Sequence, residues 1–246
     1  MNKIGGVILA AGMGSRMNST TTNKVALPLA GKPMIVHGLD LLERLNVDPV
    51  VIVVGFAKES VMKAITKKVI YAEQIERLGT AHAVQTAITE LPEGIENIIV
   101  IQGDDSAFYK EEALRKMIDL HLSNENALTF LTIELSDPVG LGRVVRDESG
   151  VILKIVEEKD ATEEEKKIKE INPACYVFSV SFLRKYLPQV KKSDITGEYY
   201  LVNLIELAQI NNEKFEAVKN GPIAWRGVNT PDELREAENL YQEVNS

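Results

Sequence analysis

Short apolar runs that stop at glycine or at polar residues constrain the fold of this chain more than any other feature. Residues 7–11 form the first run and lead directly into Gly12, and residues 50–54 and 98–101 repeat the pattern. Such runs are typical of strands that are buried on both faces of a sheet. The sequence therefore predicts several strands with both faces covered.

Segments with helical spacing separate these runs. Pro33 suits the first turn of a helix, and Ile35, Leu39 and Leu42 follow it along one face. A second stripe of this kind consists of Leu114, Met117, Ile118 and His121. Strands and helices thus alternate up to about residue 122, which predicts βαβ units and a parallel sheet.

The second half of the chain is less regular. Short turns between its strand-like segments suggest antiparallel pairing and a mixed sheet, and these segments are residues 127–135, 142–146, 151–157 and 174–179. Residues 163–169 form a charge run, for which we expect a solvated helix with Glu163 and Lys167 paired. Because linker-like tracts and internal repeats are absent from the sequence, we expect residues 1–246 to form one domain with an extended lobe.

Composition excludes several classes of protein. The 246 residues include 16 glycines, 9 prolines and one cysteine, which rules out collagen-like, disordered and disulfide-stapled chains. Lys and Arg number 28 against 36 Asp and Glu, for a net charge of −8. Without a basic run such a chain is a poor nucleic-acid binder, so we expect no nucleic-acid partner and only local anion sites. Neither a signal peptide nor a membrane span of roughly 18 apolar residues is expected.

The turn after the first apolar run has the composition of a phosphate-binding loop. It reads Leu-Ala-Ala-Gly-Met-Gly-Ser-Arg over residues 9–16. Glycines let the backbone approach a ligand closely, and successive N–H groups can cradle phosphate oxygens. The turn matches neither the dinucleotide fingerprint, whose third glycine is missing, nor a Walker loop, because no Gly-Lys-Ser/Thr follows. On these residues alone, a plain tight turn is an equal alternative.

Two cations and one carboxylate strengthen the interpretation of this turn as part of a phosphate-binding site. An arginine such as Arg16 can clamp phosphate with two hydrogen bonds, and the apolar residues 25–29 would fix the base of Lys24. Asp104 follows an apolar run, at the strand end where open α/β sheets bind ligands. Mg²⁺ takes one or two carboxylates together with phosphate and water oxygens, and Asp104 suits that need. Taken singly, these residues could also be surface charges and a loop aspartate that caps the next turn.

The order and spacing of these motifs resemble the signature of sugar-phosphate nucleotidyltransferases, carried here by residues 9–17, Lys24 and residues 28–34. Later motifs are similar to the uridyltransferase domain of bacterial N-acetylglucosamine-1-phosphate uridyltransferases, at residues 78–83, 156–162 and 197–200. The resemblance implies an α/β, Rossmann-like nucleotidyltransferase fold, with a mixed, mostly parallel sheet flanked by helices and a small antiparallel sugar-binding lobe. It also implies that residues 1–246 are a single nucleotidyltransferase domain. The C-terminal left-handed β-helix of the bifunctional relatives has no counterpart here, so acetyltransferase activity is not expected.

The resemblance also implies a role for each site residue. Arg16 and Lys24 would be the catalytic cations on the triphosphate, and Asp104 and Asn229 would ligate Mg²⁺. The sugar phosphate would be held by Gly142, Glu157 and Asn172. The nucleotide would be held by Leu9, Ala10, Ala11, Gly12, Gly14, Gln74, Gly79 and Thr80.

The reaction implied is uridylyl transfer from UTP to N-acetylglucosamine 1-phosphate or a related sugar 1-phosphate, giving a UDP-sugar and pyrophosphate. The UDP-sugar would be a precursor of the cell envelope, and the protein is expected in the cytoplasm. Both reactants are polyanions, and two unit charges about 4 Å apart repel by roughly 4 kcal/mol at an effective dielectric of 20. Local cations must offset that repulsion, and no side-chain nucleophile is needed because the sugar phosphate is itself one. The alternatives are a thymidylyl- or cytidylyltransferase for another phosphorylated small molecule, and a non-catalytic nucleotide-sugar sensor.

The histidines and the cysteine are expected in supporting positions. His37 and His121 fall within helix stripes and are expected to pack there. His82 follows Thr80, a candidate helix N-cap, and is expected beside the site rather than as a ligand. Cys175 lies in an apolar segment and is expected to be a buried, inert thiol.

Departures from the family pattern cluster around the expected sugar pocket. The family usually has an aromatic or apolar residue before Gly-Asp and a proline two residues after it, a tyrosine in Gly-x-Gly-Arg, and Thr-Gly after the asparagine. The residues found instead are Gln102, Ser106, Leu141, Pro173, Ala174 and, where an aspartate is usual, Asn203. Nucleotidyl transfer is therefore predicted more firmly than the identity of the sugar. The oligomeric state of the relatives depends on their β-helix and is not carried over.

Overall fold

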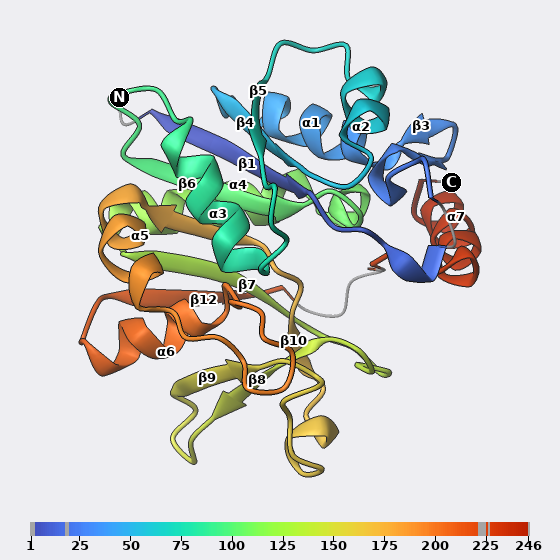
Figure 1. Cartoon of the computed structure of the whole chain (residues 1–246). Helices are drawn as coiled ribbons and strands as arrows, with labels where there is room; N and C mark the ends of the chain where they lie inside the picture. The colour runs from blue at the N-terminus through green and yellow to red at the C-terminus, as the bar shows by residue number, and fades with distance from the viewer. Residues whose placement is uncertain (1–2, 18–19, 221–224, 226, 246) are drawn as a thin grey trace.

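The computed structural model describes residues 3–17, 20–220, 225 and 227–245, and among these residues ten strands form one large sheet (Figure 1). Across the sheet the order is β5 (Ile70–Glu73), β4 (Val50–Val54), β1 (Ile4–Ala10), β6 (Asn97–Gln102), β11 (Tyr176–Ser179), β7 (Leu128–Glu134), β10 (Glu170–Asn172), β8 (Gly142–Arg146) and β9 (Ile152–Val156). A tenth strand, β12 (Phe215–Lys219), pairs in parallel with β7. The mixed α/β architecture expected from the sequence is confirmed.

Strands β5, β4, β1 and β6 are parallel and form the first half of the sheet. All seven residues of β1 are buried, because helices cover both faces of the sheet. Alternate side chains of β1 enter two separate cores, with Ile8 on one face and Val7 on the other. The apolar runs at 7–11, 50–54 and 98–101 are therefore the buried parallel strands that their composition predicts.

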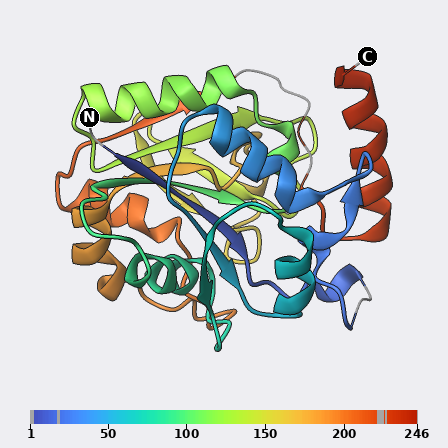
Figure 2. The ribbon, with the colours of Figure 1, turned by 90° about the horizontal axis from the view of Figure 1, so that it is seen from above.

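Helices lie on both faces of the sheet (Figure 2). One face carries α1 (Met34–Arg44), α2 (Lys58–Ala64) and α4 (Glu111–Ser123), and the other carries α3 (Thr80–Thr89), α5 (Val180–Tyr186) and α6 (Asn203–Ile210). The last helix, α7 (Pro231–Asn245), packs beside the small β2–β3 hairpin (Pro28–Leu29 and Lys32–Pro33), where Ala30 N donates to Glu238 Oε1 at 3.2 Å. Short 3₁₀ helices complete the described chain: η1 (Ser15–Met17), η2 (Lys24–Ala26), η3 (Ser106–Phe108), η4 (Glu165–Lys167) and η5 (Leu187–Gln189).

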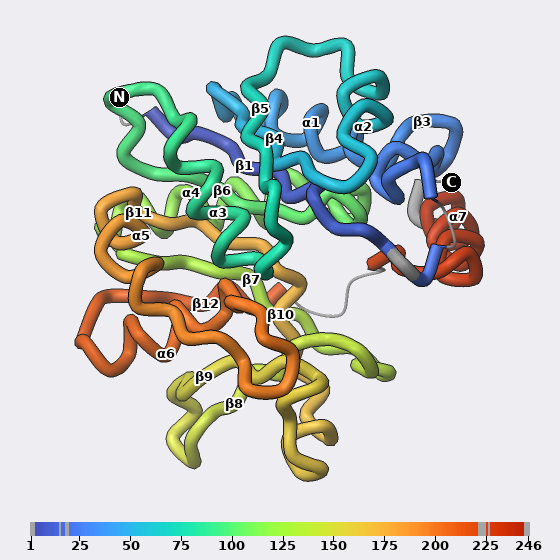
Figure 3. Tube along the Cα trace, in the orientation of Figure 1, coloured from blue at the N-terminus to red at the C-terminus, as the bar shows by residue number. Residues whose placement is uncertain are grey.

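The antiparallel half of the sheet divides at a kink between β10 and β11. Both strands belong to one segment that runs antiparallel to β7, but β11 also pairs with β6 whereas β10 also pairs with β8. Between them Pro173 cannot donate a backbone hydrogen bond, and Ala174 has a left-handed φ of 56°. The kink directs β10, β8 and β9 away from the main sheet and forms the small antiparallel lobe (Figure 3).

The prediction of a helix at residues 163–169 is wrong. Only η4 is helical there, and the ion pairs join residues three apart, Lys166 with Glu163 and Lys167 with Glu164. The Glu165 carboxylate accepts from Thr162 N at 2.8 Å and pairs with Lys154 at 2.9 Å, which fixes a tight turn. The chain then enters β10, so pairing with β7 and β8 overrides the local helical preference. Strands β5, β10 and β12 were not expected from the sequence.

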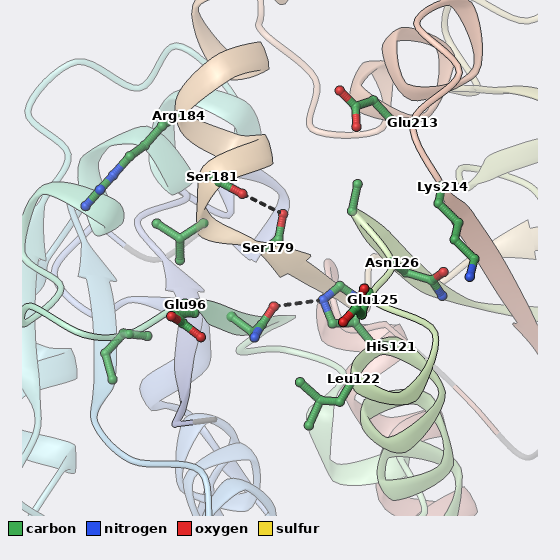
Figure 4. A pocket seen from close by; sticks show the side chains of 14 residues that line it. Glu96, His121, Leu122, Glu125, Asn126, Ser179, Ser181, Arg184, Glu213 and Lys214 are labelled. Atoms are coloured by element: carbon green, nitrogen blue, oxygen red, sulfur yellow. Dashed lines mark hydrogen bonds between the residues drawn. The ribbon is translucent and has the colours of Figure 1, made fainter. Parts of the chain in front are cut away.

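A cavity of about 590 Å³ opens at the amino end of β6 (Figure 4). His121 is buried in its wall, with Nδ1 3.1 Å from Thr129 Oγ1 and Nε2 3.1 Å from Asn97 Oδ1. Asn126 Nδ2 donates to the same threonine oxygen at 3.0 Å. A neutral imidazole that is protonated on Nε2 satisfies these contacts, and burial lowers the pKa of His121 to about 4. The packing role expected for His121 thus includes a buried polar network.

No helix in the part of the chain that the structure describes combines the length and the apolar character needed to cross a bilayer.

We expect His121 to make the protein sensitive to acid. The unfolded chain takes up a proton near pH 6.5 and the folded one near pH 4, so stability is lost as pH falls below 6.5, by about 3 kcal/mol in total and about 1 kcal/mol between pH 7 and 5.5. Urea unfolding at both pH values, with His121→Gln as the matched variant, isolates this contribution. Equal losses in the two proteins would contradict the assignment.

Candidate active site

The candidate site lies where the strand order of the parallel half reverses. From β1 the chain passes through α1 to β4 and through α2 to β5, and then α3 returns it to β6 on the other side of β1. The loops that leave β1 and β6 therefore diverge, and ligands of open α/β sheets bind in this crevice at the carboxyl ends of the strands. Gly12 follows β1, Gln74 follows β5 and Asp104 follows β6, so all three reach the same edge.

A cavity of about 380 Å³ occupies this crevice. Most of the residues expected to hold the nucleotide line it, namely Leu9, Ala10, Ala11, Gly12, Gln74, Gly79 and Thr80, and Lys24 and Asp104 lie in its wall as well. A side chain added at Gly12 would meet no atom within 4 Å, so this backbone faces open space. The cavity is thus the place where the glycine turn can approach a ligand.

Gly14 and Arg16 lie outside this lining. Gly14 has a φ of +56°, and a Cβ there would lie 3.2 Å from Lys24 Cδ, so its backbone packs against the lysine stem. Arg16 belongs to η1 and its side chain is exposed. The structure therefore brings Lys24 to the crevice and leaves Arg16 at the surface beside it.

Asn23 fixes the glycine turn, although nothing in the sequence distinguished it from a loop asparagine. Its side chain is buried, and Nδ2 faces the carbonyl oxygens of Ala10, Gly12 and Phe56 at 3.0, 3.1 and 2.9 Å. Its Oδ1 accepts from Val25 N at 3.1 Å, which caps η2. One amide thus ties the turn after β1 to the turn after β4 and to the base of Lys24.

Gln74 is buried in the cavity wall and is held by two contacts. Its Nε2 donates to Gly79 O at 3.1 Å and to His82 Nδ1 at 2.9 Å. His82 therefore supports the site from behind, where it was expected. Thr80 is not the N-cap of α3, because Gly79 holds that position and Thr80 Oγ1 accepts from Leu201 N at 2.9 Å.

Gly79 allows a distant segment to close over the cavity. It has a φ of +105°, and a Cβ there would lie 2.5 Å from Tyr199 O. Tyr199 N donates to Leu78 O at 2.7 Å, and Ala81 N donates to Tyr199 O at 2.9 Å. The segment before α6 is thereby pinned to the start of α3. Glu198 joins the cavity wall.

A second cavity, of about 240 Å³, lies against the antiparallel lobe. It is lined by the residues expected to hold the sugar phosphate, Gly142, Glu157 and Asn172, and by Asn229. Lys24, Gln102 and Asp104 line both cavities. The two spaces therefore meet at the carboxyl end of β6.

Lys24 occupies the junction between the cavities. Its ammonium donates to the Asp104 carboxylate, to Asn229 Oδ1 at 2.8 Å and to Val228 O at 3.1 Å. The two oxygens expected to ligate Mg²⁺ thus converge on one point, although they come from segments more than a hundred residues apart. One carboxylate and one amide oxygen fit a Mg²⁺ ion whose other ligands are phosphate and water oxygens.

A capping box positions Asn229. Glu233 Oε2 accepts from Asn229 N at 2.6 Å and from Thr230 N at 3.0 Å, and Thr230 Oγ1 accepts from Glu233 N at 3.1 Å. The start of α7 therefore holds the segment before it in one conformation, with the Asn229 side chain directed at Lys24.

Glu157 is an acid of the second cavity with a strongly perturbed pKa. Burial raises its pKa to about 7, and the negative charges of Asp160 and Glu198 act in the same direction against Arg143 and Lys159. Near neutral pH this carboxyl therefore exchanges between a hydrogen-bond donor and a full acceptor.

Asn172 is buried and largely committed to protein contacts. Its Nδ2 donates to Leu131 O at 2.9 Å, and its Oδ1 accepts from Ala174 N at 3.1 Å and from the Tyr176 hydroxyl. Asn172 thus shapes the kink between β10 and β11 as well as lining the cavity.

A buried pair, Asp105 and Tyr109, lies beneath the junction. The Tyr109 hydroxyl oxygen lies 2.8 Å from Asp105 Oδ2 and 2.6 Å from Pro173 O, and Asp105 Oδ1 has no hydrogen-bond partner among the described residues. Burial raises the pKa of the Asp105 carboxyl well above its usual range, and the charge of Asp104 adds to this. Cys175 is buried nearby, as expected, and burial raises the pKa of its thiol.

Comparisons with known proteins identify the family of this chain. A family model described as nucleotidyl transferase matches residues 5–244. Bifunctional protein GlmU of Caldanaerobacter subterraneus subsp. tengcongensis is 39% identical over 242 residues, which are 98% of this chain and 52% of the relative. GlmU of Exiguobacterium sibiricum is 42% identical over 233 residues, which are 94% of this chain and 51% of the relative. The chain spans about half the length of these curated relatives.

A solved structure from Bacillus anthracis shares the fold. It is described provisionally as a glucose-1-phosphate thymidylyltransferase in complex with a sucrose, and it superposes with a TM-score of 0.83 over 99% of this chain and 97% of that chain, at 21% identity. The family match covers nearly the whole sequence, and the relatives exceed one third identity across it. This chain belongs to the nucleotidyl transferase family.

Proposed function

We propose that this chain catalyses Mg²⁺-dependent transfer of a uridylyl group from UTP to N-acetylglucosamine 1-phosphate, or to a closely related sugar 1-phosphate. The observation that carries the proposal is the meeting of two cavities at Lys24 and Asp104. The matches to GlmU proteins support the choice of uridylyl group and sugar. In this proposal residues 1–246 work as one nucleotidyltransferase domain.

The larger of the two cavities holds the nucleotide. The backbone of residues 9–12 and 79–80 contacts the base and ribose, and Gln74 selects the base from a position fixed by Gly79 and His82. Gly14 acts through the stem of Lys24, against which it packs. These contacts orient the triphosphate so that its α-phosphorus lies at the junction.

The sugar phosphate occupies the second cavity and supplies the nucleophile. Its phosphate oxygen attacks the α-phosphorus of UTP, the bond from that phosphorus to the bridging oxygen breaks, and pyrophosphate leaves. Lys24 lies where the two phosphates meet, and its ammonium offsets their repulsion; Arg16 reaches the triphosphate from the surface beside it. Glu157 accepts hydrogen bonds from sugar hydroxyls, while Gly142 and Asn172 shape the wall.

Asp104 and Asn229 hold the metal ion in this proposal. When bound, Mg²⁺ neutralises phosphate charge and orients the phosphate oxygens. Lys24 contacts both residues in the structure, so lysine and metal are neighbours in the site and share the neutralisation.

A pyrophosphate-release assay tests the proposal directly, over a grid of UTP, dTTP and CTP against N-acetylglucosamine, glucose and galactose 1-phosphates. Fastest turnover with UTP and N-acetylglucosamine 1-phosphate is expected. Preference for dTTP or CTP would establish a different nucleotidyltransferase of the same fold. Nucleotide-sugar binding without turnover of any pair would make the protein a sensor.

Asp104→Asn is expected to lower kcat by a factor on the order of 10²–10³ with the fold retained, because it removes the charge that holds the metal. Steady-state kinetics across a Mg²⁺ titration measure this loss, and circular dichroism checks the fold. Asp119→Asn, which changes an exposed aspartate on α4, is the matched control. Asp104→Asn as active as the parent would remove Asp104 from the mechanism.

Glu157 is expected to make sugar-phosphate binding depend on pH. If only the ionised carboxylate accepts from the sugar hydroxyls, its pKa of about 7 predicts a KM for the sugar 1-phosphate about ten-fold higher at pH 6 than at pH 8. Glu157→Gln is expected to lose this dependence, whereas ionisation of the substrate affects both proteins alike. Parallel pH profiles for the two proteins would show that sugar-phosphate binding does not depend on the ionised Glu157 carboxylate.

Gln74→Ala is expected to reduce the preference for UTP over CTP, since it removes a buried side chain from the wall of the nucleotide cavity. The ratio of kcat/KM for the two triphosphates measures the change. An unchanged ratio would mean that the base is selected elsewhere.

A further inference from the structure

We propose that Asp105 and Tyr109 form a buried bridge that holds the kink at Pro173 in place, and that Tyr109 is thereby a positioning residue for the sugar phosphate but not for the nucleotide. This inference deepens the proposed function and rests on it for the identity of the ligand. The bridge itself is a feature of the described structure.

A single hydroxyl joins two loops that are far apart in the sequence. The Tyr109 oxygen lies 2.6 Å from Pro173 O and 2.8 Å from Asp105 Oδ2, and both side chains are buried, with exposed fractions of 6% and 3%. Asp105 directly follows Asp104 in the loop after β6. The hydroxyl therefore connects the proposed metal-binding loop to the kink between β10 and β11.

The kink needs such a contact because regular sheet pairing is interrupted there. Pro173 has no backbone N–H, and Ala174 has a φ of 56°, which costs a residue with a Cβ about 1 kcal/mol or more. Among the described residues, three polar contacts hold the kink: Ala174 N donates to Asn172 Oδ1 at 3.1 Å, Leu131 N donates to Cys175 O at 3.0 Å, and the Tyr109 hydroxyl bonds to Pro173 O. Of these, only the Tyr109 bond reaches the loop that carries Asp104.

The bridge supports the wall of the second cavity but not that of the nucleotide cavity. Asp105, Asn172, Pro173 and Ala174 all line the second cavity, and none of them lines the nucleotide cavity. The walls of the nucleotide cavity are held independently, by Asn23 on one side and Gln74 on the other. Loss of the bridge should therefore displace the sugar-phosphate wall while leaving the nucleotide wall in place.

Tyr109→Phe removes the hydroxyl and keeps the ring. We expect the KM for the sugar 1-phosphate to rise about five-fold, because the loss of one hydrogen bond weakens the binding of one substrate by about that factor. The KM for the nucleoside triphosphate is expected to stay within about two-fold of the parent value. Hydrogen–deuterium exchange of peptides that cover residues 172–177 is expected to accelerate. Asp105→Ala cuts the bridge from its other end and is expected to reproduce both effects, should Tyr109→Phe fail to fold.

Tyr186→Phe is the matched control. Tyr186 is also buried, and its hydroxyl donates to Glu213 Oε1 at 2.7 Å, but it lies on α5 and lines neither cavity of the site. A comparable loss of stability with both KM values unchanged is expected. An equal rise of the sugar-phosphate KM in this control would make the effect of Tyr109 one of general stability and would overturn the bridge.

The outcomes separate the bridge from the proposed function. If the wild-type protein turns over no pair of substrates, the proposed function fails, and exchange at residues 172–177 still decides whether the bridge holds the kink. Unchanged exchange in Tyr109→Phe overturns the bridge, even in an enzyme that is fully active on the expected pair. Faster exchange with an unchanged KM for the sugar phosphate overturns the positioning role.

Discussion

The contact of one ammonium group with three oxygens organises the candidate site. Lys24 comes from the segment that follows the glycine turn, Asp104 from the end of β6, and Val228 and Asn229 from the segment before α7. In a chain with a net charge of −8, a cation held at this point offsets the charge of the polyanionic ligands in the proposed reaction. Much of the surrounding structure serves that contact: Asn23 fixes the base of the lysine, Gly14 packs on its stem, and the capping box of α7 presents Asn229.

The two halves of the sheet supply different walls of the site. The parallel half ends in short loops whose backbones form the larger cavity, and buried amides hold these loops in register. The antiparallel half supplies the second cavity through a kink that is strained at Ala174 and tied down by side chains. Two departures from the family pattern, Pro173 and Ala174, line this second cavity, and Tyr109 links Pro173 to Asp105. The antiparallel half of the sheet can therefore change its ligand contacts while the parallel half keeps its own.

The parts of the structure that could be predicted from the sequence are those that depend on local pattern. The apolar runs predicted β1, β4 and β6, because burial on both faces leaves a continuous apolar run. The helix stripes predicted α1 and α4, because burial on one face leaves a periodic apolar pattern. Residues 163–169 were mispredicted because pairing of β10 with strands remote in sequence outweighs the helical preference of Glu and Lys. Asn23 and Tyr109 gave no signal, since their importance arises from partners in other segments.

The sequence by itself determined the fold class and the segments that carry the site, because strand burial, the glycine turn and the order of motifs are written in consecutive residues. Only the tertiary structure decided that Asp104 and Asn229 converge on Lys24, that Arg16 stays at the surface beside the crevice, and that Asn172 is engaged with the backbone. Distances between residues that are a hundred or more positions apart depend on sheet order, on a kink and on buried hydrogen bonds. None of these has a periodic or local signature, so the geometry of the site becomes visible only when the chain is folded.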